Sequence, residues 1–174
     1  LSGAEHTPLH QVPGGERAFI VTSASKSWNL AGLKAGLIIP GAEVADVVTG
    51  LSGYVPESAS YLGVVAHATA LTDGRDWLAE ASAEIRENKQ HFADELHHAI
   101  PELTYTPSQG TYLAWLDCSP LGLDHAGQHF FEKAKVRFGQ GTDYAPSATQ
   151  FVRVNLATSK DIISEAVRRM AASL

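Results

Sequence analysis

Lys26 is a candidate nucleophile near the start of the chain. It follows the apolar run 18–22, lies among serines at positions 23, 25 and 27, and is close to Trp28. The neutral amine of a lysine beside an apolar wall is a nucleophile toward aldehydes. From its position alone, Lys26 is more simply interpreted as a solvated lysine in a turn. The residues beside it must therefore show whether it has a chemical role.

Two further polar residues flank Lys26. Ser23 could offer a hydroxyl donor, and Lys34 a positive charge, to one phosphate group. An amine next to such a pair is what a phosphorylated aldehyde cofactor requires. The spacing therefore supports a second hypothesis for Lys26, that it belongs to a cofactor site and is not simply a solvated lysine in a turn.

Arg153 is the second candidate, in the alternating segment 151–157. Val152, Val154 and Leu156 share one face of the expected strand, and Arg153 lies on the other face. A guanidinium group can clamp a substrate carboxylate through two hydrogen bonds. The alternative is an arginine on a solvated strand face, and the pattern alone favours neither.

The eight histidines raise the question of a metal site. His125 and His129 could share one helix face, but two imidazoles without a third nearby ligand make a weak site. We therefore expect surface histidines and no metal cofactor. The chain also lacks G-x-G-x-x-G, G-x-x-x-x-G-K-[ST], H-E-x-x-H and G-x-S-x-G, which removes the usual support for nucleotide binding and for zinc or serine hydrolases.

The strands and helices that must position the candidate residues can be predicted from the hydrophobic pattern. The apolar runs 18–22 and 35–39 predict two strands joined by the segment that carries Lys26. The segments 42–51 and 58–71 have helical patterns and are apolar on several sides, which favours cover by other protein. The other expected elements are a long amphipathic helix at 75–100, a hairpin of strands at 103–106 and 111–118, a helix at 126–136, a strand at 151–157 and a helix at 160–172.

Composition narrows the class of protein. The chain has 174 residues, with 13 Lys and Arg against 19 Asp and Glu, a net charge of −6 that argues against nucleic acid or an anionic membrane as partner. The single cysteine, Cys118, excludes an intrachain disulfide. No window approaches the roughly 18 apolar residues of a membrane helix, so we expect no membrane association and a cytoplasmic location.

Three segments together carry a family resemblance: 22–36 (TSASKSWNLAGLKAG), 110–117 (GTYLAWLD) and 151–159 (FVRVNLATS). They resemble the class I/II aminotransferase superfamily, pyridoxal phosphate enzymes of fold type I. The first segment fits the cofactor-lysine signature at each constrained position and is most similar to the MalY/PatB-type cystathionine β-lyase branch. The resemblance implies an α/β fold, with part of the fold type I large domain followed by a small C-terminal α+β domain.

The resemblance also implies roles for particular residues. Lys26 would bind pyridoxal 5'-phosphate covalently, and Ser23 and Lys34 would hold its phosphate, although many relatives have an arginine at the latter position. Arg153 would hold the α-carboxylate of an amino-acid substrate. The helices around 42–71 would lie near the interface of a homodimer, since family active sites are shared between two subunits.

The expected reaction is that of a C–S β-lyase. Lys26, freed by the incoming amino acid, would remove the Cα proton, a thiolate would leave from Cβ, and hydrolysis would give pyruvate and ammonia. An aminotransferase is the alternative on the same scaffold. A catalytically silent fold or assembly module is a third possibility.

The position of Lys26 predicts that this chain is the C-terminal portion of a longer protein. Met170 is the only methionine, and the family pattern places a ring-pairing Asp and a phosphate loop before the cofactor lysine. We expect residues 1–74 to be the end of the large domain and residues 75–174 to be the small domain. Without the Asp, we expect little or no lyase activity from the chain alone.

Overall fold

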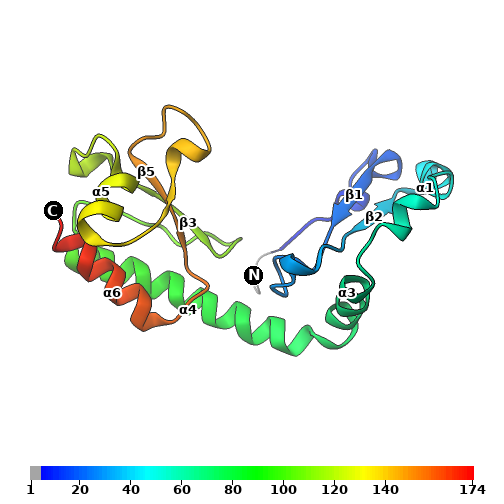
Figure 1. Cartoon of the computed structure of the whole chain (residues 1–174), viewed down its shortest axis with the longest axis horizontal. Coiled ribbons are helices and arrows are strands. Elements are labelled where there is room, and N and C mark those ends of the chain that lie inside the picture. Colours follow the sequence, from blue (N-terminus) through cyan, green and yellow to red (C-terminus); the bar gives the residue numbers. More distant parts are fainter. Residues whose placement is uncertain (1–4) are drawn as a thin grey trace. The chain divides into compact units, whose positions relative to one another are not determined.

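The computed structural model describes residues 5–174, which form two compact units, residues 5–80 and 81–174 (Figure 1). The division falls inside α4 (Arg75–Ala99), whereas the sequence analysis placed the domain boundary just before this helix. Each unit has its own strands.

A two-stranded antiparallel sheet holds the first unit together. It consists of β1 (Phe19–Thr22) and β2 (Leu37–Pro40), with Phe19 opposite Pro40 and Thr22 opposite Leu37. β1 arises from a run of β-branched and aromatic residues and β2 from an aliphatic run with two isoleucines, and both confirm the strands predicted from those runs. The connection between them contains Lys26 and a short 3₁₀ turn, Ala31–Leu33.

The helices of the first unit are shorter than predicted. The expected helix at 42–51 is a 3₁₀ turn followed by α1 (Ala45–Thr49), and the expected helix at 58–71 begins only at Tyr61. It begins there because the Ser60 hydroxyl caps it, accepting the Gly63 N–H at 3.2 Å. The helices that follow α1 are α2 (Tyr54–Glu57) and α3 (Tyr61–Asp73).

The second unit contains a three-stranded antiparallel sheet of order β3-β5-β4. Its strands are β3 (Leu113–Asp117), β4 (Gly139–Gln140) and β5 (Phe151–Asn155). Its other helices are α5 (Ala126–His129) and α6 (Lys160–Ala171), whose first turn is capped by Ser159. In the register, Arg153 of β5 lies between Trp115 of β3 and Gly139 of β4.

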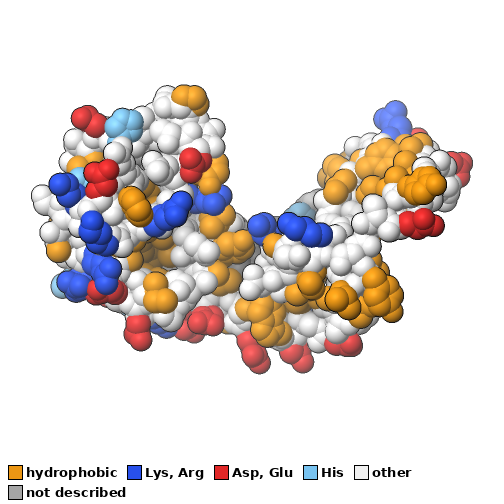
Figure 2. Space-filling model, viewed as in Figure 1, with side chains coloured by type: hydrophobic (Ala, Val, Ile, Leu, Met, Phe, Trp, Pro, Cys, Tyr) orange, Lys and Arg blue, Asp and Glu red, His pale blue; other side chains and the backbone are white. Residues whose placement is uncertain are grey.

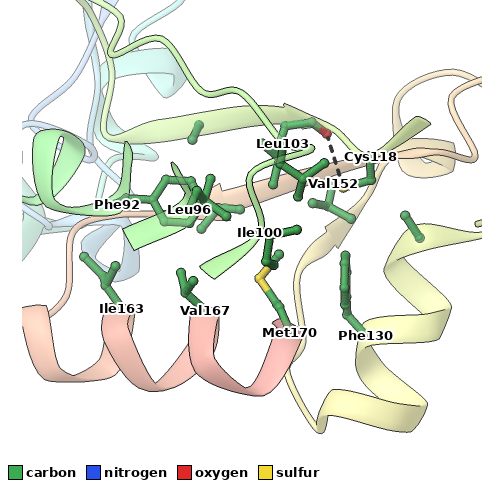
Figure 3. Packing of buried hydrophobic residues seen from close by; sticks show 14 of the residues in the cluster. Phe92, Leu96, Ile100, Leu103, Cys118, Phe130, Val152, Ile163, Val167 and Met170 are labelled. Carbon is green, nitrogen blue, oxygen red and sulfur yellow. Dashed lines mark hydrogen bonds between the residues drawn. The ribbon is translucent and has the colours of Figure 1, made fainter. Parts of the chain in front are cut away.

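The core of the second unit lies between one face of this sheet and the helices. Ile163 and Val167 of α6 point toward Phe92 and Leu96 of α4, and Met170 points toward Ile100 (Figure 3). The alternation in 151–157 is confirmed, because its apolar positions are buried in this core and Arg153 lies on the opposite face. The full set of buried apolar residues is Phe92, Leu96, Ile100, Leu103, Ala114, Leu116, Cys118, Ala126, Phe130, Ala134, Val152, Val154, Leu156, Ile163, Val167 and Met170.

The predicted strand at 103–106 is wrong, and with it the hairpin. Leu103 is buried, and the Tyr105 ring packs on Phe92 at 5.3 Å, so the apolar pattern reflects packing without strand pairing. The buried side chain of Lys89 donates to the Ser108 C=O (2.6 Å), the Ser108 hydroxyl (3.2 Å) and the Gly110 C=O (2.7 Å). The lysine therefore satisfies carbonyl groups of the irregular segment that follows 103–106.

The segment 126–140 also differs from the prediction. The expected helix at 126–136 is α5 followed by a π-helical turn, Phe130–Ala134, which ends where Lys135 adopts a left-handed conformation (φ 56°). The widened turn buries both Phe130 and Ala134. Strand β4 lies between the helix predicted at 126–136 and the strand predicted at 151–157, where no strand was expected.

Candidate cofactor and substrate site

Lys26 lies in a closed turn directly after β1. The Trp28 N–H donates to the Ala24 C=O at 3.1 Å, which closes the turn around Lys26. The Lys26 side chain is exposed, and within residues 5–174 its amine has no hydrogen bond or ion pair. Its amine is therefore available for chemistry.

Helix α3 holds this turn at two points. The Ala24 N–H donates to Nε2 of His67 (3.1 Å), and the Trp28 indole N–H donates to the Gly74 C=O at the end of α3 (2.8 Å). Ala24 and His67 are both buried, with 2% and 6% of their surface exposed. The backbone on either side of Lys26 is therefore fixed to one rigid element.

Ser23 and Lys34 suit an anion. The Ser23 Oγ accepts the Ser25 N–H at 3.3 Å, so its own O–H is free to donate to a further acceptor. Lys34 is exposed, ends the 3₁₀ turn in a left-handed conformation (φ 56°), and forms no ion pair within residues 5–174. A hydroxyl donor, an unpaired cation and the Lys26 amine in one inter-strand connection fit a phosphorylated aldehyde.

Aromatic rings surround Arg153. Its Cζ lies 4.8 Å from the centroid of the Tyr144 ring, a cation–π contact. Trp115, opposite Arg153 in the register, meets Tyr144 edge-on at 5.4 Å and stacks on Phe151 at 5.7 Å. These three rings, Trp115, Tyr144 and Phe151, are called the aromatic cluster below.

Arg153 forms no ion pair with any carboxylate in residues 5–174. Arg168 and Arg169, by contrast, both pair with Glu165, at 2.6 and 2.7 Å. A π face leaves the charge of a guanidinium unneutralised and its N–H edge free, so Arg153 can still bind a carboxylate.

β5, which carries Arg153, is anchored to α4 at its end. The Asn88 side-chain amide donates to the Leu156 C=O (3.0 Å) and to the Thr158 C=O (2.6 Å). Asn88 is buried, so this link is protected from water. The strand therefore holds Arg153 on a rigid support.

The two units carry the predicted site residues separately. Lys26, Ser23 and Lys34 all belong to residues 5–80, and Arg153 belongs to residues 81–174. Of the histidines considered for a metal site, His129 is hydrogen-bonded to the Ser173 C=O at 3.0 Å. Among residues 5–174, no three His, Cys, Asp or Glu side chains form a group that could hold a metal.

Three further residues near the candidate site, His67, Trp115 and Tyr144, were not predicted from the sequence. A signal for the first was present, because His67 is the one polar ring in the run of small apolar residues 63–70. Trp115 and Tyr144 had no comparable signal, since only the strand register and the 139–151 loop bring them to Arg153.

Comparison with known proteins identifies the family. The family model described as Aminotransferase class I and II matches residues 2–170, and the chain belongs to this family. A Mycobacterium tuberculosis (strain CDC 1551 / Oshkosh) protein named "Putative cystathionine beta-lyase" is 38% identical over 191 residues, covering 99% of this chain and 47% of the relative. Protein MalY of Escherichia coli (strain K12) is 32% identical over 167 residues, covering 93% of this chain and 43% of that protein.

A solved structure shares the fold. The crystal structure described as a "putative plp-dependent beta-cystathionase" from Corynebacterium diphtheriae matches with a TM-score of 0.87 at 33% identity, over 94% of this chain and 44% of that chain. The predicted superfamily, its cystathionine β-lyase branch and the fold type I class are thereby confirmed. The chain spans less than half the length of these relatives.

Proposed function

We propose that this chain is part of a pyridoxal 5'-phosphate-dependent C–S β-lyase of the cystathionine β-lyase type. The observation that carries the proposal is the Lys26 amine, unpaired in a turn tethered to α3 and close in the chain to the free donors of Ser23 and Lys34. The names of the relatives support the same reaction class. Small amino acids with a sulfur leaving group on Cβ are the proposed substrates.

The donors in residues 5–80 fit the cofactor. Lys26 would hold it covalently, and the Ser23 hydroxyl and the Lys34 ammonium would hold its phosphate. When bound, pyridoxal phosphate supplies a ring that accepts the electron pair left on Cα.

Two residues of this chain have roles in the reaction itself. Arg153 binds the α-carboxylate and orients the Cα–H bond, because the aromatic cluster leaves its N–H edge free. Lys26 Nζ takes the proton from Cα, after which the thiolate leaves from Cβ. The thiolate takes up a proton, and one water hydrolyses the remaining three-carbon fragment, so that the products are pyruvate, ammonia and a thiol.

Exposed apolar side chains support a homodimer. In residues 5–80 they cover both β1–β2 and the helices, with Val21 77%, Tyr54 82%, Tyr61 79% and Leu62 70% exposed (Figure 2). Side chains of this kind are normally covered by other protein, either from the same polypeptide or from a second subunit.

No helix within residues 5–174 is long and apolar enough to cross a membrane. We also propose a cytoplasmic location.

Aminotransferase activity is the second candidate, because the matching family is named for it. Product analysis of the full-length protein, with any segments that flank these residues, separates the two. Release of pyruvate and thiol from cystathionine without an added 2-oxo acid is the expected result. Amino transfer that depends on a 2-oxo acid, without pyruvate or thiol release, would reject the lyase.

A further inference from the structure

The turn that carries Lys26 is bracketed by its two anchors on α3. His67 accepts the Ala24 N–H before the lysine, and the Gly74 C=O accepts the Trp28 indole N–H after it. The two acceptors are about two helical turns apart, roughly 10 Å along the axis. The helix therefore holds the turn at both ends.

The contact at Ala24 defines the state of the His67 ring. A backbone N–H can only donate, so Nε2 must present its lone pair, and the neutral ring carries its proton on Nδ1. Ala24 and His67 are buried, so water does not replace the ring nitrogen as acceptor. Removing the ring would leave a buried N–H without a partner.

We propose that His67 is a positioning residue for Lys26: it fixes the backbone at Ala24, and with it the place from which the Lys26 amine acts. The proposal rests on the proposed function for the role of Lys26. A reacting group displaced by about 1 Å reacts on the order of a hundredfold more slowly. Without His67, α3 holds the turn at Trp28 only.

Three variants of the full-length protein isolate this contact. His67→Leu keeps an apolar side chain in the site and removes the acceptor, whereas His67→Gln offers an amide oxygen near the position of Nε2. His98→Leu makes the same chemical change at an exposed position of α4 and serves as the control.

Hydrogen–deuterium exchange tests the tether. We expect the Ala24 amide to exchange on the order of tenfold faster in His67→Leu than in wild type, with unchanged exchange in α4 and near-wild-type exchange in His67→Gln. Unchanged exchange at Ala24 in His67→Leu would overturn the proposal. A second measurement needs no variant: the ¹⁵N signals of the neutral His67 ring must show a bare Nε2 and a protonated Nδ1, and the opposite tautomer would overturn the proposal.

Covalent labelling tests the consequence for Lys26. The variants are mixed with pyridoxal phosphate and reduced with borohydride at timed intervals, and the Lys26 adduct is counted by peptide mass spectrometry. We expect the adduct to form on the order of tenfold more slowly in His67→Leu, and at the wild-type rate in His67→Gln and His98→Leu. Faster exchange at Ala24 with an unchanged adduct rate would reject the positioning role alone, whereas no adduct even in wild type would reject the proposed function and the positioning role together.

Discussion

The guanidinium of Arg153 lies over the ring of Tyr144, with 4.8 Å between Cζ and the ring centroid. Tyr144 is in turn held edge-on by Trp115, which faces Arg153 across the β3–β5 ladder. An arginine held by a carboxylate would be neutralised, whereas one held by a π face keeps its charge for an incoming anion. This relationship suits a substrate-binding arginine better than a structural one.

Replacing Tyr144 tests this relationship. Tyr144→Leu should raise KM for the amino-acid substrate about two- to fivefold with little change in kcat, because an exposed cation–π contact contributes about 0.5–1 kcal/mol. Tyr144→Phe keeps the π face and should behave as wild type. Phe131→Leu, at another exposed aromatic residue, is the control. An equal rise in KM for the Phe variant would show that the hydroxyl, not the ring face, matters.

Lys89 should be a stability determinant of residues 81–174. Burial lowers the pKa of this lysine, and its ammonium satisfies the Ser108 and Gly110 carbonyls. Lys89→Met should lower the free energy of unfolding by roughly 1–3 kcal/mol, because it removes the charged donor from both carbonyls and leaves only the Ser108 hydroxyl, at 2.9 Å, on the Gly110 C=O. Urea denaturation measures the loss against Lys133→Met, an exposed lysine. Equal stability of the two variants would contradict the account.

Cys118 should be inert in the folded protein. Burial, and secondly the charge of Asp117, raise the pKa of its thiol to about 12. The thiolate is the reactive form, so a thiol reagent should label Cys118 very slowly in buffer and readily in urea. Labelling at similar rates in both conditions would show that β3 opens to solvent far more often than its packing indicates.

Glu165 should add stability that acid removes. Hydrogen bonds from Arg168 and Arg169 lower the pKa of its carboxyl from 4.5 to about 2. The unfolded chain therefore binds a proton before the folded chain does, so this stabilisation is present above pH 4.5 and is lost as the pH falls toward 2. In Glu165→Gln, the free energy of unfolding should fall less over that range. The difference should be small and should shrink in high salt, because the pair is exposed.

Local patterns were sufficient for much of the fold. The β-branched runs at 18–22 and 35–39 predicted β1 and β2, and the three- and four-residue spacing of apolar residues predicted α4. The strand predicted at 103–106 was wrong. The prediction arose because Leu103 and Tyr105 alternate with threonines, as apolar and polar residues do in a strand. Their burial comes from tertiary packing, such as the contact of the Tyr105 ring with Phe92, and not from a strand partner.

The candidate site was partly accessible from the sequence. Lys26, Ser23, Lys34 and Arg153 were predicted because residue type and motif spacing indicate cofactor and carboxylate binding. His67 was not, because a histidine in an apolar helix does not reveal which backbone N–H its ring will meet. Tyr144 reaches Arg153 through a loop whose path no local pattern specifies.

The central claim is that Lys26 binds pyridoxal phosphate covalently. The most direct measurement is borohydride reduction of the full-length protein in the presence of the cofactor, followed by peptide mass spectrometry. The account predicts a pyridoxyl group on Lys26 and on no other lysine, and its loss in Lys26→Arg. No adduct on Lys26, or labelling spread over exposed lysines such as Lys133, would contradict it.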